Sequence, residues 1–314
     1  MKILVAGGAG FIGSHIVEQL FSAGHRVVVV DGLLPRTGGA ASNLAHLHGV
    51  TLVTEAVETS RGLSRLLADT DVTIDCMGWT QHLSALKEPS YDLHLNLLSH
   101  VCLIEALKQS SCRKVIYLGS RSQIGNPATT IISDDTPRHP VDVQGIHKTA
   151  AESHYRLFAE FSGAKVVSTI IGNTFGERMS LCGDDVGLVG GFLRDAFHNR
   201  CILVYGSGRS REFTYAPDLA KIIARLCRTD WSGFQSLNVP GCSVDIESFV
   251  QMVVQSFGRG QYRVEELPAQ IRSIDIGHAT LCRKKVHDWL GDLDSTPITS
   301  AVAETVQYVE RCTS

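Results

Sequence analysis

The strongest constraint on the fold is the regular alternation of short apolar runs with longer amphipathic stretches over the first half of the chain. β-Branched runs predict strands, and apolar residues at helical spacing predict helices between them. Expected strands lie at 2–6, 26–30, 50–54, 72–76, 114–119 and 165–171, and expected helices at 12–24, 61–70, 91–110 and 143–162. Nearly continuous apolar strands joined by helices are typical of a parallel sheet covered on both faces. The sequence therefore predicts a doubly wound α/β fold.

The pattern loosens after about residue 175, where the stretch 176–191 is rich in glycine and polar residues. Shorter helices are expected at 187–199, 217–228, 245–257 and 300–312. A chain of 314 residues allows one large domain or two unequal ones. No clean linker separates them. We therefore expect a larger domain at residues 1–175 and a smaller C-terminal α/β region at 176–314, with a soft boundary across which segments can interleave.

Composition argues against several classes of partner. The net charge of −3 suggests neither a nucleic acid nor a membrane surface. No apolar run is long enough to cross a bilayer, and the glycines of "MKILVAGGAGFIG" come too early for a signal peptide, so a cytoplasmic location is expected. The nine cysteines show no CxxC spacing. We therefore expect no metal and no disulfide framework, but reduced and mostly buried thiols.

A glycine-rich turn, "GGAGFIG" (7–13), follows the first expected strand and opens the first expected helix. Glycine permits a sharp turn and a close approach of the backbone to a phosphate, and the helix N-terminus adds free N–H groups and a partial positive charge. This strand–turn–helix context is typical of a dinucleotide-binding Rossmann domain. The residues expected to contact a cofactor in this turn are Gly7, Gly10, Phe11, Ile12 and Gly13.

Asp31 ends the second expected strand, where a dinucleotide-binding domain has an acidic residue. A carboxylate there accepts hydrogen bonds from the adenosine ribose diol and repels a 2′-phosphate. The sequence therefore predicts NAD rather than NADP as the cofactor. Arg36 is the nearby cation that argues otherwise.

The spacing GxxGxxG resembles the short-chain dehydrogenase/reductase superfamily, and later motifs resemble its extended branch, the NAD-dependent epimerase/dehydratase family. Asn96, in "YDLHLNLLSHVCLIEAL", falls where that family has an asparagine after the fourth strand. Ser120, in "YLGSRSQIG", matches the catalytic serine or threonine, and "HKTAAE" (147–152) matches the segment that holds the catalytic lysine, here Lys148. The resemblance implies that Asn96 and Lys148 bind the cofactor and that Ser120 and Lys148 take part in catalysis.

The same resemblance implies a nucleotide-diphosphate sugar as substrate. Asn173 in "IIGNTFGER", Arg211 in "GSGRSREFTYAPDLA" and Arg272 in "RSID" match the residues beside the substrate diphosphate. Arginine forks bind phosphate oxygens in bidentate fashion, so the residue types suit that ligand. The resemblance also implies a homodimer formed by the helices at 91–109 and 143–162, with Leu97, Val101 and Ile104 as apolar residues available for the contact or for the sheet.

Gln144 stands where the family has its catalytic tyrosine, four residues before Lys148. In the family the lysine lowers the pKa of the phenol, which removes the proton of a sugar hydroxyl while hydride leaves for NAD. An amide cannot ionise in this range, although it can hydrogen-bond a hydroxyl or a carbonyl. Gln144 is therefore expected to orient the substrate or a water. The proton must go elsewhere, or the usual redox cycle does not run.

Two nearby side chains are candidates to replace the phenol. His147 lies about 60° around the expected helix from Gln144, and a histidine pKa of about 6.5 suits a base. Asp142 is the second candidate, although it can cap the helix instead. His82, in the loop after the fourth strand, is expected near the nicotinamide and sugar. A structural role remains open for both histidines, and Trp79 can wall the sugar pocket or belong to the core.

Arg121 and Ser122 occupy the positions of the acid pair that dehydratases of the family carry, which disfavours 4,6-dehydration. Arg121 could instead recognise a substrate carboxylate, as decarboxylases of the family require. The leading hypothesis is epimerisation at C4 of a nucleotide-diphosphate sugar through a transient ketone. The alternatives are oxidation, decarboxylation or elimination on a related substrate, and a catalytically inactive NAD-binding regulatory protein.

Overall fold

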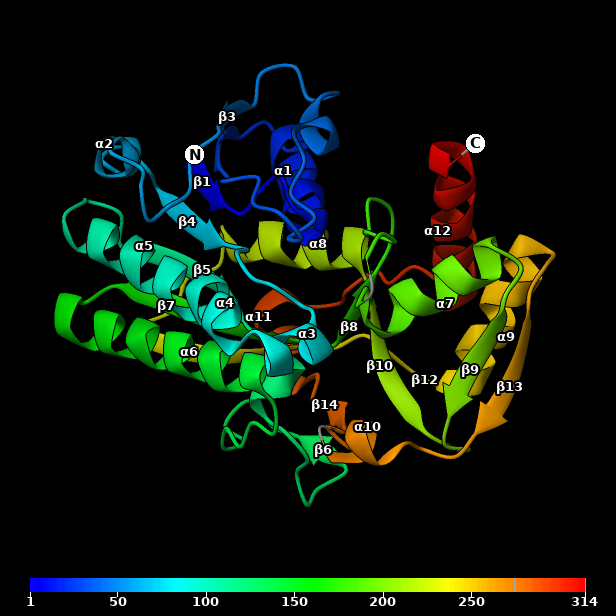
Figure 1. The fold of residues 1–314 in the computed structure, drawn as a ribbon. Coiled ribbons are helices and arrows are strands. Elements are labelled where there is room, and N and C mark those ends of the chain that lie inside the picture. Colours follow the sequence, from blue (N-terminus) through cyan, green and yellow to red (C-terminus); the bar gives the residue numbers. More distant parts are fainter. Residues whose placement is uncertain (184, 274, 314) are drawn as a thin grey trace.

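The computed structural model describes residues 1–183, 185–273 and 275–313. In this part of the chain, a seven-stranded parallel sheet with the strand order β11-β7-β5-β4-β1-β2-β3 forms the centre of the larger part (Figure 1). The expected doubly wound α/β fold is confirmed. The strands are β1 (Lys2–Ala6), β2 (Arg26–Val30), β3 (Thr51–Val53), β4 (Val72–Asp75), β5 (Lys114–Leu118), β7 (Lys165–Ile171) and β11 (Phe234–Val239). The strand order reverses direction between β1 and β4, which is the switch point where open α/β sheets bind ligands.

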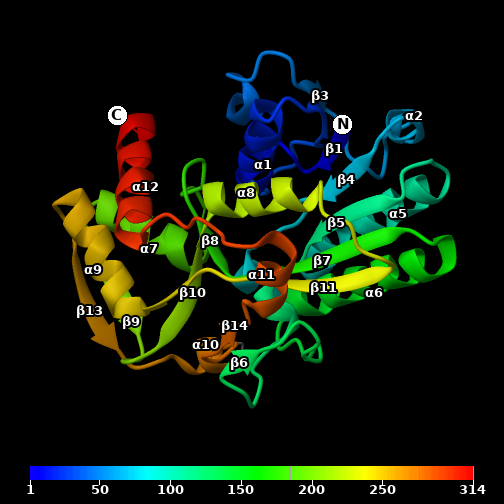
Figure 2. The same cartoon turned by 180° about the vertical axis from the view of Figure 1, so that it is seen from behind.

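Helices cover both faces of this sheet (Figures 1 and 2). One face packs against α1 (Phe11–Ser22), α8 (Ala216–Leu226) and α11 (Lys284–Leu290), and their apolar residues share a core with Ile3, Val29 and Ile116. The other face packs against α2 (Leu63–Leu67), α5 (Ser99–Lys108) and α6 (Val143–Ser162). Burial on both faces explains why the strand sequences read as continuous apolar runs.

The helix expected at 91–110 is divided into three segments. It begins as α4 (Pro89–Leu93), passes through a π-helical turn, η2 (His94–Leu98), and continues as α5. The hydroxyl of Ser99 donates to the carbonyls of His94 and Leu95 within this turn. A π turn inserts an extra residue and often marks a functional position, and here it surrounds Asn96. A further short helix, α3 (His82–Lys87), occupies the stretch where a loop was expected.

The smaller part has its own core, which contains Phe175, Phe213 and Phe249. Its main sheet has the order β12-β10-β8, and a second pair joins β13 to β9. The elements are β8 (Asn173–Phe175), α7 (Gly187–Phe197), β9 (Cys201–Tyr205), β10 (Ser210–Tyr215), β12 (Cys242–Asp245), α9 (Ile246–Phe257), β13 (Gln261–Glu265), α10 (Ala269–Ser273) and α12 (Ile298–Thr313). A short ladder between β6 (Ile131–Ile132) and β14 (Thr280–Leu281) lies beside the main body.

The chain crosses between the two parts several times after residue 175. Strand β11 is part of the large sheet, and helices α8 and α11 pack against that sheet, although all three follow β8 in sequence. The apolar strand β11 pairs with β7 over its whole length, from Phe234 beside Val166 to Val239 beside Ile171. The division at residues 175 and 176 stays a prediction, and the observed topology interleaves segments across it.

The nine cysteines are free thiols, but the expectation that most are buried is wrong. Cys112 and Cys227 are buried, whereas Cys182, Cys201, Cys242 and Cys312 are exposed. The exposed ones lie in the smaller part, where the sequence pattern is weak. Among the helices of the described residues, none is both long enough and apolar enough to span a membrane.

Candidate active site

The glycine-rich turn lies between β1 and α1, as the sequence predicts. Gly7 has a φ of +74°, and its carbonyl accepts a hydrogen bond from the Gly10 N–H at 3.2 Å. A Cβ on Gly13 would lie 2.2 Å from the same carbonyl oxygen. Only glycine permits this turn to pack against the start of α1. The predicted residues Gly7, Gly10, Phe11, Ile12, Gly13 and Asp31 line one groove, which has an empty volume of about 840 Å³.

Asp31 lies at the end of β2 and is 8% exposed. One carboxylate oxygen accepts the N–H of Ala9 at 2.9 Å and the other accepts the N–H of Leu33 at 2.9 Å. Burial raises the pKa of Asp31, against the opposing effect of these two N–H groups. Each oxygen keeps a further lone pair, so the carboxylate remains able to accept from a ribose diol.

Arg36 does not compete for this position. Its guanidinium donates to both carboxylate oxygens of Glu88, at 2.9 and 3.2 Å, and lies 4.8 Å from the ring centres of Trp79 and of Tyr91. The cation that argued for NADP is thus paired with a carboxylate and packed against two aromatic rings that also contact each other. Glu58, which the sequence reading missed, lines the groove, and its Oε1 lies 3.2 Å from Nε2 of His94. The carboxylate keeps further lone pairs for a ligand N–H such as the amino group of an adenine, so the groove is chemically suited to NAD.

Lys148 and Ser120 lie at the carboxyl edge of the sheet. The buried ammonium group of Lys148 donates to the carbonyls of Met77 and Leu118, both at 3.1 Å, which uses two of its three N–H donors. Burial lowers the pKa of Lys148, while the charges of Asp75 and other acidic groups oppose the shift. A Cβ on Gly78 would lie 3.0 Å from the Lys148 nitrogen, so glycine lets the backbone of this loop pass over the lysine.

Gln144 is 2% exposed and is tied to the backbone after β4. Its amide nitrogen donates to the Trp79 carbonyl at 2.5 Å. Asn96 holds the same residue from the other side, accepting from the Trp79 N–H at 3.0 Å and donating to its carbonyl at 2.9 Å. Trp79 itself is 1% exposed and donates from its indole to the Arg36 carbonyl, so it belongs to the core. Gln144 and Asn96 together fix the loop over Lys148.

Two histidines next to Gln144 each pair with an aspartate. His147 Nδ1 lies 2.6 Å from Asp92 Oδ1, and the other Asp92 oxygen accepts from Asn96. His82 Nδ1 lies 2.7 Å from Asp142 Oδ2. The other Asp142 oxygen caps α6 by accepting the Gly145 N–H at 2.6 Å. Asp142 therefore has the capping role that the sequence left open, and it also binds a histidine.

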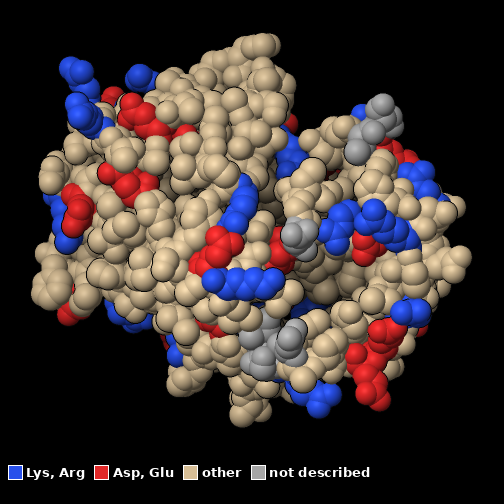
Figure 3. All heavy atoms as spheres, viewed as in Figure 1, with Lys and Arg blue, Asp and Glu red and all other residues tan. Residues whose placement is uncertain are grey.

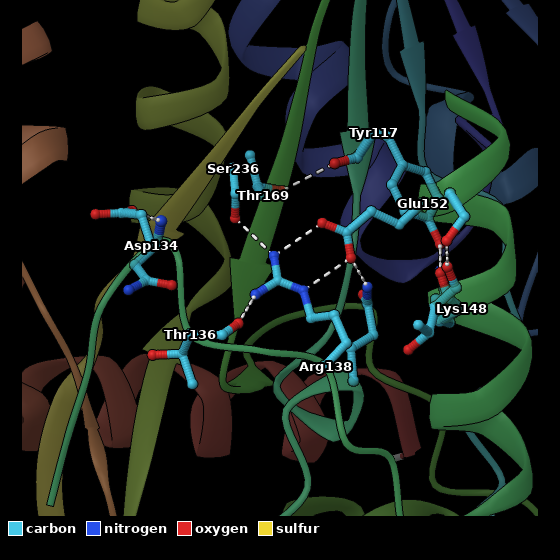
Figure 4. Close-up of polar contacts among 12 residues, drawn as sticks. Tyr117, Asp134, Thr136, Arg138, Lys148, Glu152, Thr169 and Ser236 are labelled. Atoms are coloured by element: carbon cyan, nitrogen blue, oxygen red, sulfur yellow. Dashed lines mark hydrogen bonds and ion pairs between the residues drawn. The ribbon is translucent and has the colours of Figure 1, made fainter. Parts of the chain in front are cut away.

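A buried ionic network around Glu152 and Arg138 (Figure 4) reaches Ser120 through Gln123. The Ser120 N–H donates to the side-chain oxygen of Gln123 at 2.7 Å, and the Gln123 nitrogen donates to Glu152 at 2.5 Å. Arg138 donates to both Glu152 oxygens, at 2.9 and 2.8 Å, and to the Ser236 hydroxyl at 2.6 Å. Arg138 and Ser236 were not predicted, because their partners lie far apart in sequence, whereas Gln123 forms a local capping box with Ser120 that the sequence reading missed.

A second buried network lies below Lys148. One Asp75 oxygen bonds both His100 Nδ1 and the Tyr155 hydroxyl at 2.6 Å, and the other accepts the Met77 N–H at 3.0 Å. Burial opposes ionisation of Asp75, but the charge of His100 and the hydrogen bonds outweigh it and lower the pKa of Asp75. The carboxylate therefore stays charged, and its field favours the protonated form of Lys148.

Three arginines gather around one segment, residues 275–277. Arg211 donates to the Gly277 carbonyl at 2.9 Å and to Asp275. Arg209 bonds the same Asp275 oxygen at 2.5 Å. Arg121 donates to the carbonyls of Gly125 at 2.6 Å and Ile276 at 2.8 Å. Burial and the nearby charge of Arg211 lower the pKa of Arg121 to about 10.

The other residues predicted to bind the substrate diphosphate are placed differently. Asn173 begins β8, and its amide donates weakly, at 3.5 Å, to the carbonyl of Glu212. Arg272 is exposed on α10 and bonds the Leu267 carbonyl at 3.3 Å. The Arg121 and Arg211 side chains thus bond the segment at residues 275–277, whereas the Arg272 side chain bonds the Leu267 carbonyl and only its backbone carbonyl accepts from Asp275.

Contacts between the two parts border the cleft. A hollow separates the larger and smaller parts in the space-filling view, with acidic and basic side chains of both parts around it (Figure 3). Asp185, from the loop between β8 and α7, accepts the N–H groups of Leu83 and Ser84 at 2.8 and 3.1 Å. On the α1 side, Arg178 donates to His15 Nδ1 at 2.7 Å, and His15 Nε2 lies 2.9 Å from the Glu177 carbonyl.

Comparison with known proteins agrees with this arrangement. Residues 3–239 match the model of the NAD dependent epimerase/dehydratase family. The chain belongs to this family. NAD is accordingly its cofactor, and the predicted Rossmann fold is confirmed.

Relatives within the family carry out different reactions. The chain is 25% identical over 231 residues to a putative UDP-glucose 4-epimerase of Methanocaldococcus jannaschii, covering 73% of each protein. It is 27% identical over 325 residues to UDP-glucuronic acid decarboxylase 1 of Danio rerio, covering 99% of this chain and 73% of the relative. The crystal structure of UDP-glucose 4-epimerase from Thermotoga maritima with UDP-glucose superposes with a TM-score of 0.88 at 21% identity, covering 100% of both chains. Membership in the family therefore does not choose among these reactions.

Proposed function

We propose that the protein binds NAD and epimerises a nucleotide-diphosphate sugar at C4 through a transient ketone. The observation that carries this proposal is the position of Lys148 and Ser120 together at the carboxyl edge of the sheet, next to the glycine-lined groove. Arg209 and Arg211 bond Asp275, and their guanidinium groups suit a diphosphate that would compete with this carboxylate. We call these places the lysine end (Ser120, Gln144, Lys148) and the arginine end (Arg121, Arg209, Arg211).

The residues have separate tasks in this proposal. When bound, NAD⁺ would supply the hydride acceptor, and in its reduced form the hydride donor, for the sugar carbon. The remaining N–H donor of Lys148 would hold the nicotinamide ribose, and the Ser120 hydroxyl would orient the reacting sugar hydroxyl. Gln144 keeps the loop over Lys148 in place through the Trp79 carbonyl. A bound cofactor and sugar would exclude water from the reacting carbon, which would strengthen these electrostatic contacts.

Decarboxylation receives less support from the position of Arg121. A substrate carboxylate would need an arginine with free donors that face the sugar. The terminal nitrogens of Arg121 already donate to two backbone carbonyls, and the residue is 7% exposed. Arg121 therefore suits a structural role, with its charge contributing to the field at the arginine end.

The proposal is tested with the purified protein and NAD on a panel of UDP-glucose, UDP-N-acetylglucosamine, UDP-glucuronic acid and dTDP-glucose. Formation of the 4-epimer without net NADH is the expected result. Net NADH or CO₂ would instead indicate oxidation or decarboxylation. Bound NAD without turnover on the whole panel would indicate a regulatory protein. Lys148→Met, which removes the ammonium group, serves as the inactive control.

We also propose a homodimer formed through α6 and the α4–α5 segment. Ile146, Leu157 and Phe161 form an exposed stripe on α6, and Phe161 is 83% exposed. Leu93 and Leu98 are exposed on the neighbouring segment, whereas Ile104 is buried in the core. Light scattering should give the mass of a dimer for the wild type. Phe161→Asp should give a monomer, with Leu188→Asp in the smaller part as a matched control. The cytoplasmic location stays a prediction.

A further inference from the structure

The loss of the phenol leaves the proposed reaction without its usual base, and the inference that follows rests on the proposed function. Gln144 cannot take the proton, and its amide is already bonded to the Trp79 carbonyl. A replacement must lie at the carboxyl edge of the sheet, close to the first turn of α6, and must have a ring nitrogen or carboxylate oxygen that no protein group uses.

His82 meets these requirements. It is the first residue of α3, which follows β4 at the carboxyl edge of the sheet and faces the smaller part (Figure 1). Its side chain is 37% exposed, and its Nδ1 is held by Asp142, the residue that caps α6 two positions before Gln144. A carboxylate accepts only, so Nδ1 carries the proton and Nε2 of the neutral ring has a free lone pair.

We propose that His82 is the catalytic acid–base that replaces the phenol, with Asp142 as its positioning residue. The sugar O–H bond breaks and its proton passes to His82 Nε2. The C4–H hydrogen leaves with two electrons for bound NAD⁺, so the sugar carbon is oxidised to a ketone. The same hydrogen and electron pair then return to the other face of the carbon, while the proton returns from Nε2 to the oxygen. The substrate and the product are therefore at the same oxidation level, and no further oxidant is needed.

His147 is less suited to this role, although it also pairs with an aspartate. Its side chain is 13% exposed, and its ring is directed at Asp92 of α4 rather than along the face of α6 that carries Gln144 and Lys148. Asp92 is itself fully buried and shares its second oxygen with Asn96. The His147–Asp92 pair thus belongs to the packing between α4, the π turn and α6.

The charges around His82 favour its protonated form. Desolvation acts to lower the pKa of His82, but the hydrogen bond and charge of Asp142 on α6, together with the charges of Asp185 on the β8–α7 loop and Asp92 on α4, raise it above its ordinary value of 6.5. Lys87 lies on α3, the same helix as His82, and His147 lies on α6, which packs against α3. The rate should therefore fall on the acid side of a pKa above about 6.5, because the protonated ring cannot accept a proton.

The test measures the pH profile of epimerisation for three variants, on whichever sugar of the panel the wild type converts. His82→Gln should lower kcat about 100-fold or more and abolish the acid limb, while NAD and UDP affinity change less than twofold. Asp142→Asn keeps a good helix cap but removes the charge, so it should move the acid limb to lower pH. His154→Gln replaces an exposed histidine on α6. It is the matched control and should behave as the wild type.

The outcomes separate the two proposals. An active wild type combined with a His82→Gln variant within fivefold of its rate overturns the role of His82 and leaves the proposed function intact. A wild type without turnover on the whole panel overturns both. If His82→Gln loses its circular dichroism, Asp142→Asn decides alone: an acid limb that stays in place overturns the pairing, and one that moves down supports it.

Discussion

The lysine end and the arginine end of the cleft hold their charged groups in different ways. At the lysine end, the networks around Glu152 and Asp75 lie beneath the sheet edge, and their carboxylates are fully or almost fully buried. At the arginine end, Arg209 and Arg211 extend from β10 and its preceding turn and bond Asp275, a residue of a connecting segment. The first end is held by the core of the large sheet, and the second by contacts between surface segments.

This difference indicates where the site is already formed and where a ligand must compete. Buried pairs keep Lys148 and Ser120 in place without help from a substrate. An incoming diphosphate, in contrast, meets guanidinium groups that already have an acceptor in Asp275. We therefore expect changes at the lysine end to affect folding and catalysis, and changes at the arginine end to affect binding.

The largest effect is expected from Arg138→Met, which leaves the Glu152 carboxylate buried without its cation. Removing one partner of a buried ion pair typically costs about 3–5 kcal/mol of unfolding free energy. Gln123 then loses part of its anchor, so the turnover supported by Ser120 should also fall. Urea unfolding measures the first effect and a steady-state assay the second.

Arg65→Met, at an exposed position of α2, is the control for this change and should lose less than about 0.5 kcal/mol. A loss equally small in Arg138→Met would mean that the network adds nothing to stability. The contrast between a core-supported end and a surface-supported end would then disappear.

The sequence predicted the backbone elements around the lysine end well because these elements follow local rules. The glycine turn, Asp31 and the boundaries of α6 each follow from a pattern within about 20 neighbouring residues. The helix expected at 143–162 is observed as Val143–Ser162. Arg138 and Ser236 could not be found in this way, because their hydrogen bonds join residues up to 98 positions apart.

The next effect concerns the contact between α1 of the larger part and Arg178 of the smaller part. Burial and the charge of Arg178 lower the pKa of His15 from 6.5 to about 4. Below pH 6.5 the unfolded chain takes up a proton on His15, whereas the folded chain does so only near pH 4. His15 therefore contributes stability above pH 6.5 that is lost as the pH falls toward 4. Over this range the loss in unfolding free energy amounts to about 3 kcal/mol.

Unfolding free energies of the wild type and of His15→Gln, measured by urea at several values between pH 7 and pH 4.5, check this expectation. Subtracting the two curves isolates His15 from the other titrating groups. Parallel curves would show that the ring is protonated in the folded state, and the contact with Arg178 would then have to open.

The arginine end was harder to predict because its geometry depends on how loops meet. Arg211 and Arg121 were proposed from the resemblance, and both bond the segment at residues 275–277. Nothing in the local sequence indicated that Asp275 would occupy Arg209 and Arg211 together. The break of the 91–110 helix at a π turn was missed for a related reason, because Asn96 bonds a loop 17 residues away.

A smaller effect is expected from Arg211→Leu, which removes one guanidinium from the arginine end. A hydrogen bond to a charged group contributes about 1.5–3 kcal/mol, so UDP should bind roughly 10–100-fold more weakly, with NAD affinity unchanged. Isothermal titration of each ligand measures this. Arg263→Leu, which removes an exposed arginine from β13, is the matched control. Equal UDP affinity in Arg211→Leu and the wild type would place the diphosphate elsewhere.

The smallest effect, and the one that most directly tests the contrast, is expected from Asp275→Asn. If Asp275 competes with the diphosphate, neutralising it should tighten UDP binding a few-fold, corresponding to less than about 1 kcal/mol at this partly exposed pair. The gain should shrink as salt is raised, because it is electrostatic. If Asp275 instead holds Arg209 and Arg211 in position for the ligand, the same substitution should weaken binding at every salt concentration. The sign of the change therefore decides between an arginine end that a ligand must open and one that is already formed, like the lysine end.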